Sequence, residues 1–209
     1  KLKPEFAESH YNLGAAFQDL EHLDEAVKSY KTAILLQPDY ADAHYNLGIL
    51  YHDIGQLEMA IKSLGVAIII KPENAEAHKY LGNTLQTNGQ VEEAIKCYEK
   101  ALSINPEHAD AHRNLSTIKK YTQGDKQFIL MKKLLTTGSL DQSNQIHLCF
   151  ALAKAYEDLE MQDELFEVLH EGNRLRKEQL NYSLDLDLNE HLILRNLHNI
   201  SPYVTEKLI

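Results

Sequence analysis

Histidines are the first candidates for chemistry, because the chain holds eleven of them. Four recur at a constant step of 34 residues: His10, His44, His78 and His112. Zinc needs ligand nitrogens about 2 Å away, whereas equivalent side chains of stacked helical units lie about 10 Å apart. We therefore expect these four to pack in the place of an aromatic side chain and to share no metal. A metal at His108 and His112 stays an alternative, although the former follows Pro106 in a predicted turn.

Motifs for catalysis are missing from the sequence. It has no glycine-rich phosphate loop, no Ser-His-Asp order and no nucleophile-elbow motif. Acidic pairs such as Asp24-Glu25 and Glu92-Glu93 begin predicted helices, where the helix dipole stabilises negative charge. We expect this chain to hold no catalytic residue, no metal and no cofactor.

Asparagines form a second series at the 34-residue step. Asn12, Asn46 and Asn114 belong to it, and Tyr80 takes the remaining place. An asparagine amide donates and accepts, so a row of them can pair with the backbone of an extended peptide. The alternative to peptide binding is that these asparagines simply contact solvent on an exposed helix face. The preceding position in each copy holds Tyr11, Tyr45, Lys79 and Arg113.

The elements that would position these side chains follow the same step. The pairs Leu13-Gly14, Leu47-Gly48 and Leu81-Gly82 form one series; Ala26, Ala60 and Ala94 form a second, and Pro38, Pro72 and Pro106 a third. Leu13, Phe17 and Leu20 have the spacing of one helix face, and a second helix is predicted over 23–36. Gly55 and Gly89 fit the turns inside two of the copies. The pattern predicts helix-turn-helix units that stack on one another.

The string His10-x-x-Leu13-Gly14-x-x-Phe17, followed by Ala26-x-x-x-Tyr30 and by Pro38, resembles the tetratricopeptide repeat. The resemblance implies an all-α fold: a right-handed superhelical solenoid of antiparallel helix pairs, whose first helices line a concave groove. It also implies that the chain is a non-catalytic scaffold binding a protein or extended peptide there. The groove residues would be Asn12, Asn46, Asn114, Tyr11, Tyr45, Lys79, Asn83 and Arg113.

Two more specific resemblances concern this groove. The asparagine series is similar to the asparagine ladder in the repeat region of O-linked N-acetylglucosamine transferase. Lys79, Asn83 and Asn114 resemble the first members of the two-carboxylate clamp in chaperone-tail-binding repeats. That clamp would need cations in the next unit, where His147 and Ala151 stand, so we do not expect a complete clamp.

The repeat pattern divides the chain into four parts. Residues 1–122 hold units 1–3 and the first helix of unit 4. Residues 123–145 hold a divergent second helix, expected over 125–136, with a small insertion. Residues 146–181 form a degenerate fifth unit. Residues 182–209 form a capping helix, expected over 187–199, and a tail.

The C-terminal third suggests an alternative function. Residues 150–159 and 166–175 resemble the segment that precedes the catalytic domain in bacterial tetratricopeptide–sulfotransferase proteins. This resemblance implies the partner- or substrate-recruiting region of a longer bacterial sulfotransferase. A third hypothesis is self-association through an uncovered apolar end of the stack.

Composition excludes other classes of partner. The net charge of −10 argues against nucleic acid, and no apolar run approaches the length of a membrane span. Cys97 and Cys149 are isolated, which favours reduced thiols and a cytoplasmic location. Lys1 in place of methionine suggests a trimmed start.

Overall fold

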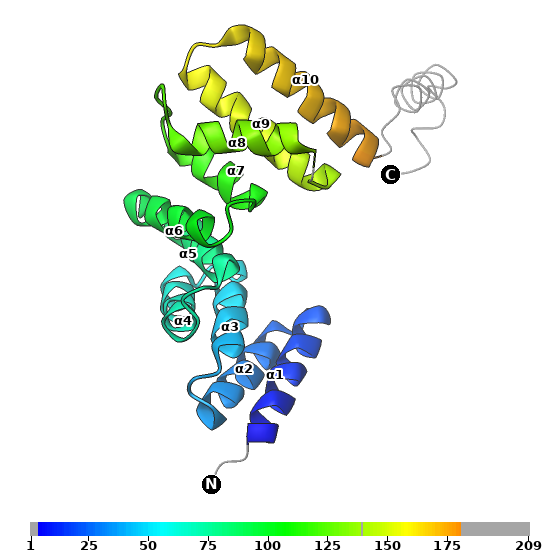
Figure 1. Cartoon of the computed structure of the whole chain (residues 1–209). Helices are drawn as coiled ribbons and strands as arrows, with labels where there is room; N and C mark the ends of the chain where they lie inside the picture. The colour runs from blue at the N-terminus through cyan, green and yellow to red at the C-terminus, as the bar shows by residue number, and fades with distance from the viewer. Residues whose placement is uncertain (1–3, 139, 181–209) are drawn as a thin grey trace, which may run out of the picture.

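The computed structural model describes residues 4–138 and 140–180, and all regular secondary structure within them is α-helical. Figure 1 shows the helices stacked in chain order from α1 to α10. The predicted capping helix over 187–199 lies outside the described residues. The helices are α1 (Pro4–Asp19), α2 (Leu23–Leu36), α3 (Ala41–Asp53), α4 (Leu57–Ile70), α5 (Ala75–Thr87), α6 (Val91–Ile104), α7 (Ala109–Ile118), α8 (Lys126–Thr137), α9 (Gln142–Asp158) and α10 (Gln162–Gln179).

A glycine lies at the helix crossing of the hairpins α1–α2, α3–α4, α5–α6 and α9–α10. A Cβ added to Gly82 of α5 would lie 2.6 Å from Tyr98 Cε1 of α6, and one added to Gly48 of α3 would lie 2.6 Å from Leu64 Cγ of α4. Tyr98 and Leu64 are fully buried. The repeating glycine therefore lets the two helices of one unit approach closely enough for a large side chain to fill the crossing.

The turn inside each hairpin depends on one residue in the left-handed conformation. Gly55 has φ 77° and Gly89 has φ 80°, while Glu21 and Glu160 hold the same place at φ 60° and 58°. The following N–H then reaches back to close the helix end, as from Gln90 N to Leu85 O at 2.8 Å. These four turn residues set how the second helix follows the first inside units 1, 2, 3 and 5.

The recurring histidines tie each unit to the loop before it. His44, His78 and His112 each place Nε2 within 2.9–3.0 Å of the carbonyl oxygen of the proline six residues earlier. A carbonyl only accepts, so Nε2 carries the proton and donates. His112 is fully buried, and its burial lowers its pKa. These side chains thus hold the loops between units, and the described residues contain no group of three or more His, Cys, Asp or Glu placed to hold a metal ion.

Unit 4 departs from the regular hairpin. α7 ends at Ile118, and α8 packs chiefly on α9, which also packs on α7. Asp125 caps α8 by accepting from Gln127 N at 2.9 Å and pairs with Lys119 Nζ at 2.8 Å. A cavity of about 600 Å³ lies between α6, α7 and α8. Leu102, Leu115 and Leu130 are among the residues that line it.

None of the helices in the described ranges has both the length and the apolar character needed to cross a bilayer.

Candidate partner-binding face

First helices of successive units contact one another at two places in the stack. α3 packs directly on α5 and α7 on α9, whereas within the described residues no two second helices pack to that extent. The first helices of units 2 and 3, and those of units 4 and 5, are therefore in direct contact. We call the surface formed by α1, α3, α5, α7 and α9 the first-helix face. All eight predicted groove residues belong to α1, α3, α5 or α7.

Tyrosines dominate the α1 end of this face. The ring of Tyr11 lies 5.1 Å from that of Tyr40 and 5.9 Å from that of Tyr30, centroid to centroid. Asn46 of α3 donates from Nδ2 to Tyr11 Oη at 3.0 Å and lies 3.5 Å from Tyr30 Oη. Burial is the main reason that the pKa of Tyr30 is raised to about 12, so its hydroxyl stays protonated. Asn46 therefore joins units 1 and 2 through its amide nitrogen.

A second aromatic contact follows between α3 and α5. Tyr45 and Tyr80 meet edge to face at 5.7 Å. Burial, followed by the nearby Tyr80 and Glu76, raises the pKa of Tyr45. Lys79 Nζ lies 4.4 Å from the centre of the Tyr80 ring, within the range of a cation–π contact. The aromatic contacts of the face thus end on α5, where Tyr80 lies between Tyr45 and Lys79.

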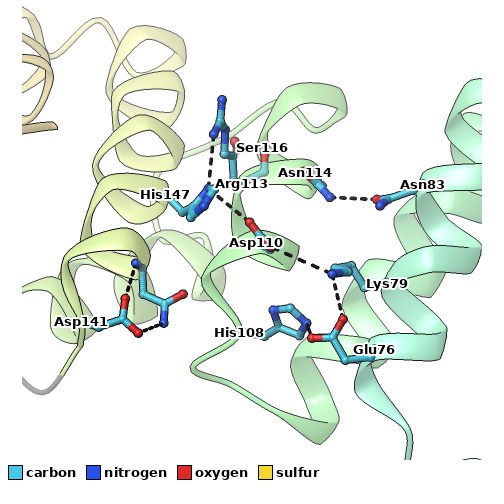
Figure 2. Close-up of polar contacts among 11 residues, drawn as sticks. Glu76, Lys79, Asn83, His108, Asp110, Arg113, Asn114, Ser116, Asp141 and His147 are labelled. Carbon is cyan, nitrogen blue, oxygen red and sulfur yellow. Dashed lines mark hydrogen bonds and ion pairs between the residues drawn. The ribbon is translucent and has the colours of Figure 1, made fainter. Parts of the chain in front are cut away.

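Asn83 is the polar junction between α5, α6 and α7. Its Oδ1 accepts from Tyr98 Oη at 2.9 Å and from Asn114 Nδ2 at 2.8 Å. Tyr98 Oη also lies 2.8 Å from Gln86 Oε1. Figure 2 shows Asn83 and Asn114 pointing toward one another from neighbouring helices.

A charged network joins α5 to α7 beside this junction. Lys79 Nζ lies 2.8 Å from Glu76 Oε2 and 3.9 Å from Asp110 Oδ2, and only 7% of Lys79 is exposed. His108 Nε2 lies 3.0 Å from Glu76 Oε1, at ion-pair distance but without hydrogen-bond alignment. The lysine charge is therefore balanced inside the chain by two carboxylates (Figure 2).

The network continues to α9 through His147. Its Nδ1 lies 3.2 Å from both Arg113 Nη1 and Asp110 Oδ1. Burial, reinforced by Arg113, lowers the pKa of His147 despite the nearby Asp110. A neutral Nδ1 accepts from Arg113, whereas a protonated one donates to Asp110. The Arg113 guanidinium also lies 5.6 Å from the Phe150 ring centre, and that of Arg176 lies 5.5 Å away.

The predicted groove residues therefore have different environments. Asn12 is exposed, and its side chain has no partner among the described residues. Asn46 and Asn114 already use their amide nitrogens within the chain, and Lys79 is buried. The contacts of His147 with Arg113 and Asp110 were not predicted from the sequence, although His147 lies one 34-residue step after Arg113.

Stacked helical hairpins with a residue step of 34 define an α-helical repeat solenoid. Family models described as TPR repeat match residues 19–55 and 50–89, and one described as tetratricopeptide repeat matches residues 75–108. Residues 19–108 therefore consist of tetratricopeptide repeats.

Comparisons with individual proteins extend this picture. An uncharacterised protein of Aquifex aeolicus (strain VF5) is 31% identical over 93 residues, which are 44% of this chain and 12% of that protein's length. This chain therefore spans only a small part of that relative. A crystal structure of MamA protein matches with TM-score 0.67 and 22% identity, covering 87% of this chain and 98% of that one.

A further match is the first TPR of Spaghetti (RPAP3), solved bound to the HSP90 peptide SRMEEVD. It has TM-score 0.55 and 20% identity and covers 56% of this chain and 93% of that one. At these identities the two solved structures show the shared fold. The family matches end at residue 108, so the resemblance of residues 150–175 to sulfotransferase-linked segments stays a prediction.

Proposed function

We propose that the chain is a protein-interaction scaffold that holds an extended peptide along the first-helix face. The observation that carries the proposal is the repetition of two adjacent side-chain positions over four first helices: Tyr11-Asn12, Tyr45-Asn46, Lys79-Tyr80 and Arg113-Asn114. Units 1 and 2 offer the same Tyr-Asn pair, whereas units 3 and 4 offer Lys-Tyr and Arg-Asn, so the two halves of a long ligand would meet different side-chain environments. The RPAP3 repeat with its bound HSP90 peptide supports this use of the fold.

The side chains along the face indicate what such a peptide would contain. Near α1 and α3, Tyr11 and Tyr45 supply aromatic surface for an apolar side chain of the ligand. The amide of Asn12 and the Oδ1 of Asn46 have no hydrogen-bond partner within the described residues and supply backbone contacts. Near α7, Arg113 is half-buried beside Asp110 and His147.

A ligand carboxylate would meet competition near Lys79 and Arg113. Glu76 and Asp110 already face Lys79, so an acidic peptide would have to displace one of them. We therefore place the apolar part of the ligand on the α1–α3 end and expect its affinity to be the sum of several weak contacts. An acidic tail alone should bind poorly, and SRMEEVD is a suitable peptide for measuring this.

The test uses a random decapeptide library selected on the whole chain, followed by calorimetric titration of the selected peptide. Asn12→Ala removes an exposed amide without an internal bond, and Arg113→Gln removes the guanidinium. Each should weaken binding about tenfold. Lys28→Gln on the exposed side of α2 is the matched control and should leave affinity unchanged. Equal affinities for all four proteins would reject the first-helix face as the binding site.

The alternative stays open that the chain recruits partners or substrates for a sulfotransferase domain elsewhere in a longer protein. It rests on the sequence resemblance of residues 150–159 and 166–175. The parent reading frame decides it, since this alternative requires a downstream domain with a phosphosulfate-binding loop. A cytoplasmic location is likewise proposed from the two isolated cysteines.

A further inference from the structure

The cavity between α6, α7 and α8 lies where two parts of the hydrophobic core meet. Leu102 and Leu115 belong to the cluster that α4, α5, α6 and α7 share, whereas Leu130 packs on the cluster of α8 and α9. Leu102 and Leu130 are only half-buried, so both present apolar surface to the space of about 600 Å³ between the clusters. That volume is within the range of about 300–1,000 Å³ that is usual for small-molecule sites.

A buried amide forms part of the polar wall of this cavity. Gln127 is 9% exposed, and its Nε2 lies 3.3 Å from both Nδ1 and the carbonyl oxygen of His112. The only polar contact of Gln127 Oε1 within the described residues is Lys119 Nζ, at 3.5 Å. Hydrogen bonds to an amide oxygen are normally about 2.7–3.2 Å long. The oxygen therefore keeps the capacity to accept a hydrogen bond from a ligand.

The charges around the cavity balance one another. Lys119 Nζ lies 2.8 Å from Asp125 Oδ2, and the exposed Glu99 and Lys126 carry opposite charges. His112 is neutral, because burial lowers its pKa while its Nε2 donates to the Pro106 carbonyl. The lining thus offers a ligand no net charge. Since burying an unpaired charge is costly, this wall favours a neutral ligand over an ionised one.

We propose that the cavity binds a small neutral molecule with an apolar body and one hydroxyl group. The body would contact Leu102, Leu115 and Leu130, and the hydroxyl would donate to Gln127 Oε1. Because these leucines belong to α6, α7 and α8, the ligand would link unit 3 to unit 4. None of the eight predicted groove residues lines the cavity, so the inference does not rest on peptide binding.

The test uses octanol as the probe and follows its titration into the whole chain by amide NMR. We expect saturable shifts in the amide signals of the residues that line the cavity. Two analogues examine the chemistry of the site. Octyl methyl ether keeps the apolar chain but cannot donate a hydrogen bond, and octanoate carries a negative charge. Each should bind about tenfold more weakly than octanol.

Three variants locate the site on the chain. Leu130→Trp fills the cavity and should weaken octanol binding at least about tenfold. Ile129→Trp is the matched control, because Ile129 is the adjacent residue of α8 and is 56% exposed, and it should bind like the wild type. Gln127→Leu removes the acceptor and should bind octanol and octyl methyl ether equally. Circular dichroism of each variant checks that its helices are intact.

Several results would overturn the proposal. The first is a folded wild type in which octanol causes no saturable shift at the lining residues. Unchanged affinity of a folded Leu130→Trp variant would place the probe elsewhere, and octanoate binding as tightly as octanol would contradict a neutral ligand. Shifts confined to the first-helix face would mean that octanol occupies the proposed peptide site instead of the cavity.

Discussion

Asn114 of α7 donates a hydrogen bond from Nδ2 to Oδ1 of Asn83 of α5 over 2.8 Å, and so joins two first helices that belong to successive units. The same Asn83 oxygen accepts from the fully buried Tyr98. An asparagine on the first-helix face can therefore be a structural link between units. Removing such an asparagine side chain should therefore lower the stability of the chain as well as any affinity for a ligand.

The Asn83–Asn114 link should appear as a coupling energy in a double-mutant cycle. We expect Asn83→Ala and Asn114→Ala each to destabilise the chain, and the double variant to lose less than their sum by about 0.5–1.5 kcal/mol. Urea unfolding of the four proteins measures this. Asn12→Ala, which removes an exposed side chain, should change stability by no more than about 0.5 kcal/mol. Strictly additive losses would mean that the hydrogen bond contributes nothing.

Gly82 should not tolerate a methyl group. Gly82→Ala places Cβ 2.6 Å from Tyr98 Cε1 and 3.0 Å from Cζ, and the ring is fully buried. We expect a loss of about 1–3 kcal/mol in the free energy of unfolding, because the ring and the helix crossing must shift.

Gly65 of α4 provides the control for this substitution, since a Cβ there meets nothing within 4 Å. Gly65→Ala should stabilise the chain by about 0.5–1 kcal/mol through helix propensity alone. Equal effects of the two substitutions in urea unfolding would contradict the close crossing.

The turn in unit 1 should improve with glycine. Glu21 has φ 60° where Gly55 and Gly89 stand in units 2 and 3. Glu21→Gly should raise the free energy of unfolding by about 0.5–1 kcal/mol, because glycine adopts this conformation without steric cost. The reverse change, Gly89→Glu, should lower it by a similar amount. Thermal and urea unfolding of both variants check the sign.

Asp125 should make the stability of the chain depend on acid pH. Burial on its own would raise the pKa of Asp125, but the hydrogen bond from Lys119 and those from Phe128 N and Gln127 N outweigh it and lower the pKa. The folded-state pKa of Asp125 therefore lies below its unfolded-state pKa of about 4, so ionised Asp125 stabilises the fold above about pH 4. This stabilisation is lost as the pH falls through the folded-state pKa.

Asp125→Asn isolates this effect, since asparagine is also a good N-cap but carries no charge. We expect the variant to lack this part of the acid dependence in urea unfolding measured between about pH 2 and pH 7. Asp125→Ala should in addition lose about 0.5–2 kcal/mol at pH 7, because the α8 cap is removed. Parallel pH curves for the wild type and Asp125→Asn would show that the Lys119 pair does not stabilise the fold.

The sequence by itself determined the features that depend on contacts within one repeat. The predicted second helix over 23–36 has the same bounds as α2, and the recurring Gly48 and Gly82 lie at equivalent close crossings of two helices. These features could be predicted because a 34-residue step repeats the same local environment, so that each copy supports the interpretation of the others.

Only the tertiary structure decided which side chains face one another across units. Asn46 and Asn114 belong to one sequence series, yet the first bonds Tyr11 and the second bonds Asn83, because their partners come from different positions on the neighbouring helices. The burial of Lys79 by Glu76 and Asp110 and the packing of α8 on α9 depend likewise on how units stack. Periodicity fixes the place of a side chain on its helix, but its partner depends on the distance and angle between helices, which no single repeat contains.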